Sequence, residues 1–265
     1  MTETEVLLRA KVDGVLTLTL NRPKKLNAMS HEVFDALDAA IAAARGDRGV
    51  RVIVVTGAGT FFSAGADISM VKEFSDPDLP AETFRQKIRH LQSIFDRLEE
   101  LEKPVIAAIN GPCVGGAVDL ILACDLRIAV EDAFFLVPEV RLGLIPDLGA
   151  TQRLPRIVGV GRAKEMILTA RRFTAEECRA MGLINRVVPR DSLDGAVREM
   201  ANDLMAGGPL AVGVAKRAID RAWATDLRSG EEFEAVAQGS LYRSDDAREG
   251  YAAFVEKRAP KWTGR

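Results

Sequence analysis

The 265-residue sequence is poor in the residues that most often carry metal and nucleophilic chemistry. It has two histidines and three cysteines, and none of them are paired at a metal-ligand spacing. We therefore expect no metal site. A Ser-His-Asp or Cys-His enzyme would have to use His31 or His90, and we expect both histidines at the surface. Any catalysis should depend on carboxylates and backbone groups.

The sequence also lacks an excess of either charge and lacks long apolar runs. Its 36 basic and 38 acidic residues are interspersed and leave a net charge of −2. This balance argues against a nucleic-acid partner, because such proteins usually carry a basic face. No apolar run approaches the roughly 20 residues that cross a bilayer, and the first six residues do not resemble a signal peptide. We expect a cytoplasmic protein with no membrane partner.

The first half of the chain alternates strand and helix patterns, which favours a layered α/β architecture. Strands are indicated by period-two alternation or by short β-branched runs, and helices by apolar residues three and four apart. The predicted strands cover residues 15–20, 52–56, 105–110 and 126–129, and the predicted helices cover residues 30–44, 80–101 and 117–123.

Helical patterns dominate from about Thr151 onward. The predicted helices cover residues 150–158, 161–169, 175–181, 192–205, 209–224 and 244–257, with one strand at 184–188. No Ser/Gly-rich linker separates the two halves. We predict a core domain over residues 1–195 and a C-terminal helical region over residues 196–265, which packs on its own core or on a neighbouring subunit.

A dinucleotide-binding motif is suggested, and then excluded, at the end of the strand at 52–56. Gly57-Ala58-Gly59 begins the pattern GxGxxG, but the third glycine position holds Phe62. No helix signal begins there either. A nicotinamide cofactor is therefore not expected.

Two glycine-containing segments follow buried strands, where ligand sites of α/β sheets gather. The first is Gly65-Ala66-Asp67, and the second runs from Gly111 to Gly116 and opens into an apolar helix. One backbone N–H from each segment could converge on a carbonyl oxygen that becomes anionic, forming an oxyanion hole. The alternative is that both are ordinary glycine turns required by chain geometry.

Three carboxylates stand in apolar surroundings, where pKa values rise and proton exchange near neutrality becomes feasible. They are Asp119, Glu139 and Asp147. Each also has a structural interpretation. Asp119 would complement its helix dipole, Asp147 would cap the helix that follows, and Glu139 would pair with Arg141 or Arg153. Together the three favour chemistry.

These features resemble the crotonase (enoyl-CoA hydratase/isomerase) superfamily over nearly the whole chain. The matching segments are Asn21-Arg22-Pro23, Asn27-Ala28, Phe62 to Ile68, Ile109 to Gly111, Gly115-Gly116, Ala123 to Arg127, Pro138-Glu139, Leu142 to Pro146, and Thr151 to Leu154. The resemblance implies a crotonase (ClpP-like) spiral of ββα repeats. It also implies a C-terminal helical region for trimerisation, as a homotrimer or dimer of trimers, and an acyl-CoA thioester substrate.

Roles for individual residues also follow from the resemblance. The N–H groups of Ala66 and Gly116 would form the oxyanion hole for the thioester oxygen. Coenzyme A would be part of the substrate, with no separate cofactor. The residues implied in its binding are Arg22, Lys24, Leu26, Ala64, Asp67, Ile68, Phe254 and Lys257, the last two often from across a subunit boundary.

The acid/base positions distinguish the subfamilies. Hydratases typically carry glutamates at the positions of Asp119 and Glu139 and a glycine at position 147. Asp119, Glu139 and Asp147 together resemble the Δ3,5-Δ2,4-dienoyl-CoA isomerases, in which Glu139 and Asp147 would act at opposite ends of a diene. Asp119 would support them. The Gly65 to Ile68 segment and Pro138 look more hydratase-like.

The function expected is therefore a shift of C=C bonds in (di)enoyl-CoA during fatty-acid β-oxidation, by carboxylate proton transfer. The alternative is an enoyl-CoA hydratase that adds water to trans-2-enoyl-CoA. A non-enzymatic acyl-CoA-binding or RNA-binding homologue is a further class, but the even charge pattern shows no basic stripe.

Overall fold

The computed structural model of the protein describes residues 5–265 and contains two sheets. The larger has the strand order β1-β2-β3-β4-β6-β9, with β1 antiparallel to β2 and the other neighbours parallel. Its strands are β1 (Leu7–Val12), β2 (Val15–Leu20), β3 (Val52–Gly57), β4 (Val105–Ile109), β6 (Leu126–Val130) and β9 (Arg186–Val188). The smaller sheet contains β5 (Cys113–Val114), β7 (Phe134–Leu136) and β8 (Phe173–Thr174).

The chain passes repeatedly from the larger sheet to the smaller one. β4 of the larger sheet is followed by β5 of the smaller sheet and then by a helix, and β6 is followed in the same way by β7. The β5–β7 pair is parallel, so successive turns of the chain stack in the same direction. This confirms the predicted spiral of ββα repeats.

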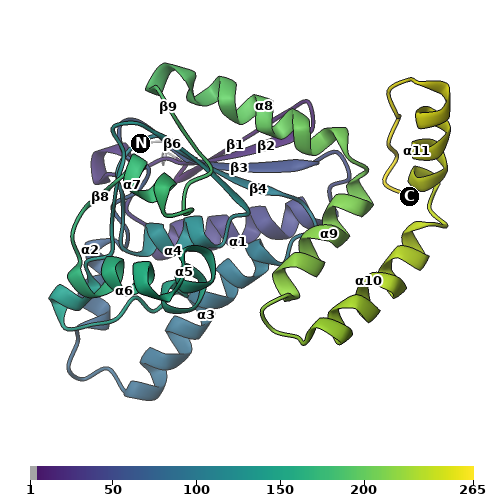
Figure 1. The fold of residues 1–265 in the computed structure, drawn as a ribbon. Helices are drawn as coiled ribbons and strands as arrows, with labels where there is room; N and C mark the ends of the chain where they lie inside the picture. Colours follow the sequence, from purple (N-terminus) through teal and green to yellow (C-terminus); the bar gives the residue numbers. More distant parts are fainter. Residues whose placement is uncertain (1–4) are drawn as a thin grey trace.

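The helices lie around the larger sheet and extend beyond it (Figure 1). They are α1 (His31–Gly46), α2 (Ile68–Phe74), α3 (Ala81–Glu99), α4 (Gly116–Leu122), α5 (Ala150–Val158), α6 (Val160–Thr169), α7 (Ala175–Ala180), α8 (Leu193–Ala206), α9 (Pro209–Arg221), α10 (Leu227–Leu241) and α11 (Asp245–Glu256). Short 3₁₀ helices are η1 (Pro23–Lys25), η2 (Glu139–Leu142) and η3 (Arg190–Ser192).

Both faces of the larger sheet are covered. α8 contacts β3, β4 and β6 on one face, and α1 packs against α3 on the other (Figure 1). All five residues of β4 are buried, as expected for a parallel strand between two helical layers. Phe34 of α1 and Phe95 of α3 meet with ring centroids 5.7 Å apart. The core therefore fixes the carboxyl ends of β3 and β4, from which the glycine segments extend.

Most predicted elements are confirmed within one to three residues, while others are added. The predicted helix at 150–158 matches α5, and both histidines are exposed. β1, α2, α10 and the strands of the smaller sheet had no predicted counterpart. The predicted domain boundary at residue 195 falls within α8, which packs on the larger sheet. The division of the chain at this residue stays a prediction.

The C-terminal helices α10 and α11 extend away from the core, and α11 lies at the far end of the molecule from α2 (Figure 1). No buried side chain is found on α10 in this structure. Within residues 5–265, no helix is both long and apolar enough to cross a membrane. Four of the six residues to which the signal-peptide expectation refers, residues 1–4, lie outside the described residues.

Candidate active site

The two glycine segments come together beside the ends of β3 and β4. The Val114 N–H donates to the Ser63 carbonyl oxygen at 3.1 Å. A Cβ on Gly65, whose φ is +88°, would lie 2.6 Å from the Val114 oxygen and 3.3 Å from the Gly116 nitrogen. Glycine is therefore required by both the left-handed φ and the close approach. Among the described residues, the N–H groups of Ala66 and Gly116 have no hydrogen-bond acceptor.

Arg22 and Asp67 hold the first of these segments in place. A guanidinium nitrogen of Arg22 lies 2.7 Å from the Asp67 carboxylate and 2.5 Å from the Ala28 carbonyl oxygen. Asp67 also caps α2 by accepting from the Ser69 N–H at 2.9 Å. This hydrogen bond, with Arg22, lowers the pKa of Asp67 to about 2. Both residues, predicted to bind coenzyme A, use their side chains to shape the loop that presents Ala66.

The other residues of this region that were predicted to bind coenzyme A surround the same loop. The Ala64 N–H donates to the Leu26 carbonyl oxygen at 2.9 Å, which joins the two predicted segments. Leu26 has a φ of +51° and is 44% exposed, while Ile68 is 71% exposed at the start of α2. Lys24 is exposed on η1. The structure thus gathers these residues on one accessible rim.

Phe254 and Lys257 lie elsewhere. Phe254 is 84% exposed near the end of α11, and Lys257 follows as the exposed C-cap with a φ of +54°. Because α11 and α2 lie at opposite ends of the molecule (Figure 1), these residues do not meet Ala66 within one chain. Phe254 and Lys257 could contribute to the same site only if a second copy of the chain supplied them.

Asp119 is the most deeply buried of the three carboxylates. It lies in the first turn of α4 and is 2% exposed. One carboxylate oxygen accepts from the Ala150 N–H, the first residue of α5, at 2.6 Å. Burial raises its pKa to about 7, and the negative charges of Glu139 and Asp147 add to the rise. The prediction that Asp119 complements a helix dipole is thus partly right, although the N–H group that its carboxylate accepts from belongs to α5.

Glu139 begins η2 and turns toward the second glycine segment. Its Oε1 lies 3.0 Å from where a Cβ on Gly115 would be, beside Gly116. Its Oε2 is buried and has no hydrogen-bond partner among the described residues. Burial raises the pKa of this carboxyl, and the charge of Asp147 adds to that rise. Glu139 therefore places a carboxyl group whose protonated form is favoured by burial beside the second glycine segment.

The proposed structural pairing of Glu139 is wrong. Arg153 instead contacts Asp96 at 2.6 Å and Glu99 at 2.7 Å, both on α3. Arg141 donates to the Thr169 carbonyl oxygen.

Asp147 lies in the loop between Gly143 and Gly149. Burial raises the pKa of its carboxyl. It does not cap α5, because Gly149 is the N-cap residue, so that alternative is wrong. The negative charge of Asp147 raises the pKa of Glu139, and the charges of both raise the pKa of Asp119, as expected for carboxylates in one region of the fold.

Gln92 of α3 holds the Asp147 loop and was not predicted. Its amide nitrogen donates to the Asp147 carbonyl oxygen at 2.6 Å, and Arg153 donates to the neighbouring Leu148 oxygen at 3.2 Å. Gln92 and the two partners of Arg153 are spaced i, i+4 and i+7, so they share one face of α3. In the sequence this polar face is indistinguishable from a solvated one.

Within residues 5–265 the structure has no group of three His, Cys, Asp or Glu residues placed to hold a metal ion. The three cysteines are free and buried.

A spiral α/β fold with two unpaired N–H groups on adjacent glycine segments and three carboxylates of raised pKa defines a class of proteins, and comparison with known proteins identifies the family. The enoyl-CoA hydratase/isomerase family model matches residues 10–265, and the chain belongs to this enzyme family. The short-chain-enoyl-CoA hydratase of Clostridium acetobutylicum is 40% identical over 250 residues, which cover 94% of each chain.

Two further relatives are similar over almost the whole chain. The peroxisomal Delta(3,5)-Delta(2,4)-dienoyl-CoA isomerase of Arabidopsis thaliana is 37% identical over 266 residues, which cover 97% of this chain and 96% of the isomerase. The crystal structure of an enoyl-CoA hydratase from Bacillus anthracis superposes with a TM-score of 0.92 at 37% identity. That match covers 98% of this chain and all of the hydratase.

Proposed function

We propose that the protein isomerises 3,5-dienoyl-CoA to 2,4-dienoyl-CoA, using Glu139 and Asp147 as its acid/base pair. One observation carries the proposal. An oxygen of Asp119 is engaged by the Ala150 N–H at 2.6 Å, whereas Glu139 has an unpartnered buried oxygen. Asp119 is therefore a supporting group whose carboxylate holds the first residue of α5 by a hydrogen bond. The two carboxyls with raised pKa that remain are Glu139 and Asp147.

The thioester oxygen would bind between the N–H groups of Ala66 and Gly116. These donors have no other acceptor among the described residues, and Gly116 begins α4, whose dipole favours negative charge at this end. Deprotonation next to the thioester moves charge onto that oxygen, so fixed donors lower the energy of the enolate. The proposed oxyanion hole would thus make the C2 proton of the substrate more acidic.

The proton transfers balance without a co-reactant. Glu139, which lies beside Gly115, would take the C2 proton, and the electron pair of that C–H bond would move into the enolate. Collapse of the enolate shifts the double bonds from C3 and C5 to C2 and C4, and protonated Asp147 would supply the new proton at C6. Proton exchange with solvent then restores both carboxyls. Coenzyme A is part of the substrate, so no cofactor is consumed.

Substrate binding is proposed to use the rim around the Ala66 loop. Lys24 offers a charge for a coenzyme A phosphate, and Leu26 and Ile68 offer exposed apolar surface. Phe254 and Lys257 would come from a neighbouring subunit of a homotrimer or dimer of trimers, because one chain does not bring them to the site. Fatty-acid β-oxidation in the cytoplasm is the proposed setting.

Hydration of a 2-enoyl-CoA is the second candidate. The observation that favours it is the unpartnered Oε2 of Glu139, which could hold the attacking water. In this case Asp119 and Glu139 would act together, and Asp147 would have no role in the chemistry.

Replacing Asp147 by asparagine separates the two candidates. The amide cannot release a proton, so we expect conversion of a 3,5-dienoyl-CoA to fall by about 10²-fold or more. Formation of the conjugated 2,4-dienoyl thioester, followed by absorbance and by deuterium uptake in heavy water, measures this. Asp35→Asn, at an exposed position of α1, is the matched control. Wild-type water addition without dienoyl isomerisation, undiminished in Asp147→Asn, would reject the isomerase.

Replacing Gln92 by leucine is expected to lower the kcat of the same isomerisation about tenfold, with little change in KM. Loss of its hydrogen bond to the Asp147 carbonyl frees the loop, and a small displacement of a catalytic group is costly. Steady-state kinetics give the two constants. Gln86→Leu, on the same helix but exposed, should leave both unchanged. An unaltered kcat in Gln92→Leu would exclude this positioning role.

A further inference from the structure

A cavity of about 790 Å³ lies on the edge of the larger sheet opposite the candidate active site. It is lined by residues that precede β3 and β4, including Val50 and Pro104, whereas the candidate active site follows the other ends of these strands. Six residues of a strand span roughly 20 Å, so the two sites are separated by about that length. α9 and the segment after α11 form the cavity's outer wall.

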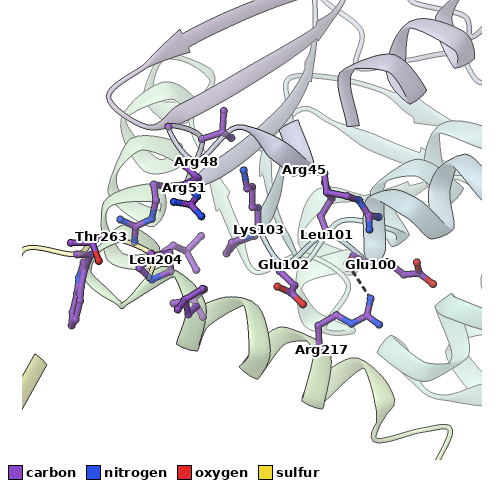
Figure 2. Close-up of a pocket in the computed structure, with 18 residues that line it drawn as sticks. Arg45, Arg48, Arg51, Glu100, Leu101, Glu102, Lys103, Leu204, Arg217 and Thr263 are labelled. Carbon is purple, nitrogen blue, oxygen red and sulfur yellow. Dashed lines mark hydrogen bonds between the residues drawn. The ribbon is translucent and has the colours of Figure 1, made fainter. Parts of the chain in front are cut away.

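Five cationic side chains line this cavity. They are Arg45, Arg48, Arg51, Lys103 and Arg217, and Figure 2 shows them approaching it from different elements. Within residues 5–265 none of the five forms an ion pair with a carboxylate, whereas some surface arginines elsewhere do, as Arg179 does with Glu176. Two carboxylates, Glu100 and Glu102, also line the cavity. The lining therefore has an uncompensated positive charge.

Three of the cations are held by main-chain carbonyls. Arg51 donates to the Gly207 oxygen at 2.8 Å, and Arg217 donates to the Glu100 oxygen at 3.0 Å. Lys103 donates to the Ala44 and Asp47 oxygens. These carbonyls lie at or just beyond the C-terminal ends of α8, α3 and α1, whose dipoles offset part of the charge. The bonds fix the direction of each cation.

The partial burial of two of the cations favours the binding of an anion. It lowers the pKa of both Arg51 and Lys103, which means that these cations are held partly out of water. The remaining two, Arg45 and Arg48, are exposed at the entrance and have no hydrogen-bond acceptor among the described residues. A bound anion would therefore gain two free donors and relieve the cost of two half-buried charges.

The shape of the cavity selects among anions. Its volume is within the range of small-molecule sites, and it is much larger than a single phosphate requires. Arginine forks suit phosphate oxygens, and apolar side chains, among them the half-buried Leu204 and Trp262, supply a surface for a flat ring. We propose that this cavity binds a nucleoside diphosphate, with its phosphates on the arginines, at a site separate from the reaction.

Calorimetric titration with ADP tests the proposal. We expect Arg45→Glu/Arg48→Glu to weaken ADP binding at least tenfold, because charge reversal at the entrance repels phosphate. Neither side chain has a hydrogen-bond acceptor among the described residues, so the fold should persist, and thermal unfolding checks this. Arg198→Glu, on an exposed position of α8, is the control and should bind like the wild type.

Three outcomes would overturn the proposal. The wild type could fail to bind ADP, or the double variant could bind it as tightly as the control does. The double variant thus also separates this cavity from ADP binding at the proposed coenzyme A rim, which it leaves intact. Thirdly, inorganic pyrophosphate could bind as tightly as ADP, which would exclude a role for the nucleoside. None of these outcomes depends on whether the protein isomerises dienoyl-CoA.

Discussion

Replacing Glu139 by glutamine is expected to lower turnover of enoyl- or dienoyl-CoA by about 10³-fold, within the range found when an acid/base group is removed. Glutamine has nearly the same shape, so the η2 turn and the contact with Gly115 should persist. What disappears is the ionisable carboxylate beside Gly115, whose Oε2 has no hydrogen-bond partner among the described residues. Because both proposed mechanisms use this carboxylate, the loss is expected for isomerisation and hydration alike.

The kinetic pattern distinguishes a catalytic from a structural part for Glu139. Since glutamine leaves the Ala66 and Gly116 donors in place, KM should change little while kcat collapses. Glu131→Gln is the matched control, because Glu131 is exposed between β6 and β7, and it should retain full activity. A Glu139→Gln variant that keeps more than a tenth of wild-type kcat would remove this residue from the proposed mechanism.

Local patterns were enough to predict the parts of the site that follow buried strands. The runs that form β3 and β4 are strongly apolar, and the glycines after them predicted two adjacent turns. The free N–H of Gly116 follows from its place at the start of α4. Asp119 was identified because a carboxylate in an apolar helix is unusual, and the structure places it at 2% exposure.

Features that depend on distant partners were not predicted. β1 is an edge strand with one buried residue, and α10 has none, so neither has the apolar period that indicates such elements. The Gln92 hydrogen bond joins residues 55 positions apart. Arg22 and Asp67 were assigned to substrate, but their ion pair, which holds the loop, becomes visible only when the chain is folded.

Ionisation of Asp119 is expected to lower the stability of the fold, whereas ionisation of an aspartate with a lowered pKa raises it. The folded pKa of Asp119 is about 7, above the usual value of 3.8, so the folded protein binds more protons than the unfolded chain between these values. Stability is therefore lost as pH rises from about 4 to 7, by up to about 4 kcal/mol at 1.36 kcal/mol per pKa unit. Above pH 7 the loss is complete.

Replacing Asp119 by asparagine should abolish this pH dependence. An asparagine oxygen can still accept from the Ala150 N–H, but it carries no charge to bury. Relative to wild type, the variant should gain about 3 kcal/mol of stability between pH 5 and pH 9, which corresponds to on the order of 5–10 °C in Tm. Any constant cost of the substitution cancels in this difference.

Thermal unfolding at pH 5 and pH 9 measures the effect, with Asp203→Asn, at an exposed position of α8, as a control that should follow the wild type. Parallel pH curves for Asp119→Asn and wild type would show that Asp119 is ionised in the folded protein throughout. A buried anion would then have to be stabilised by the Ala150 N–H and Arg153, and Asp119 would repel a charged Glu139 at neutral pH. The expected result instead leaves Asp119 about half protonated near pH 7, so that Glu139 can bear the charge needed to accept a proton.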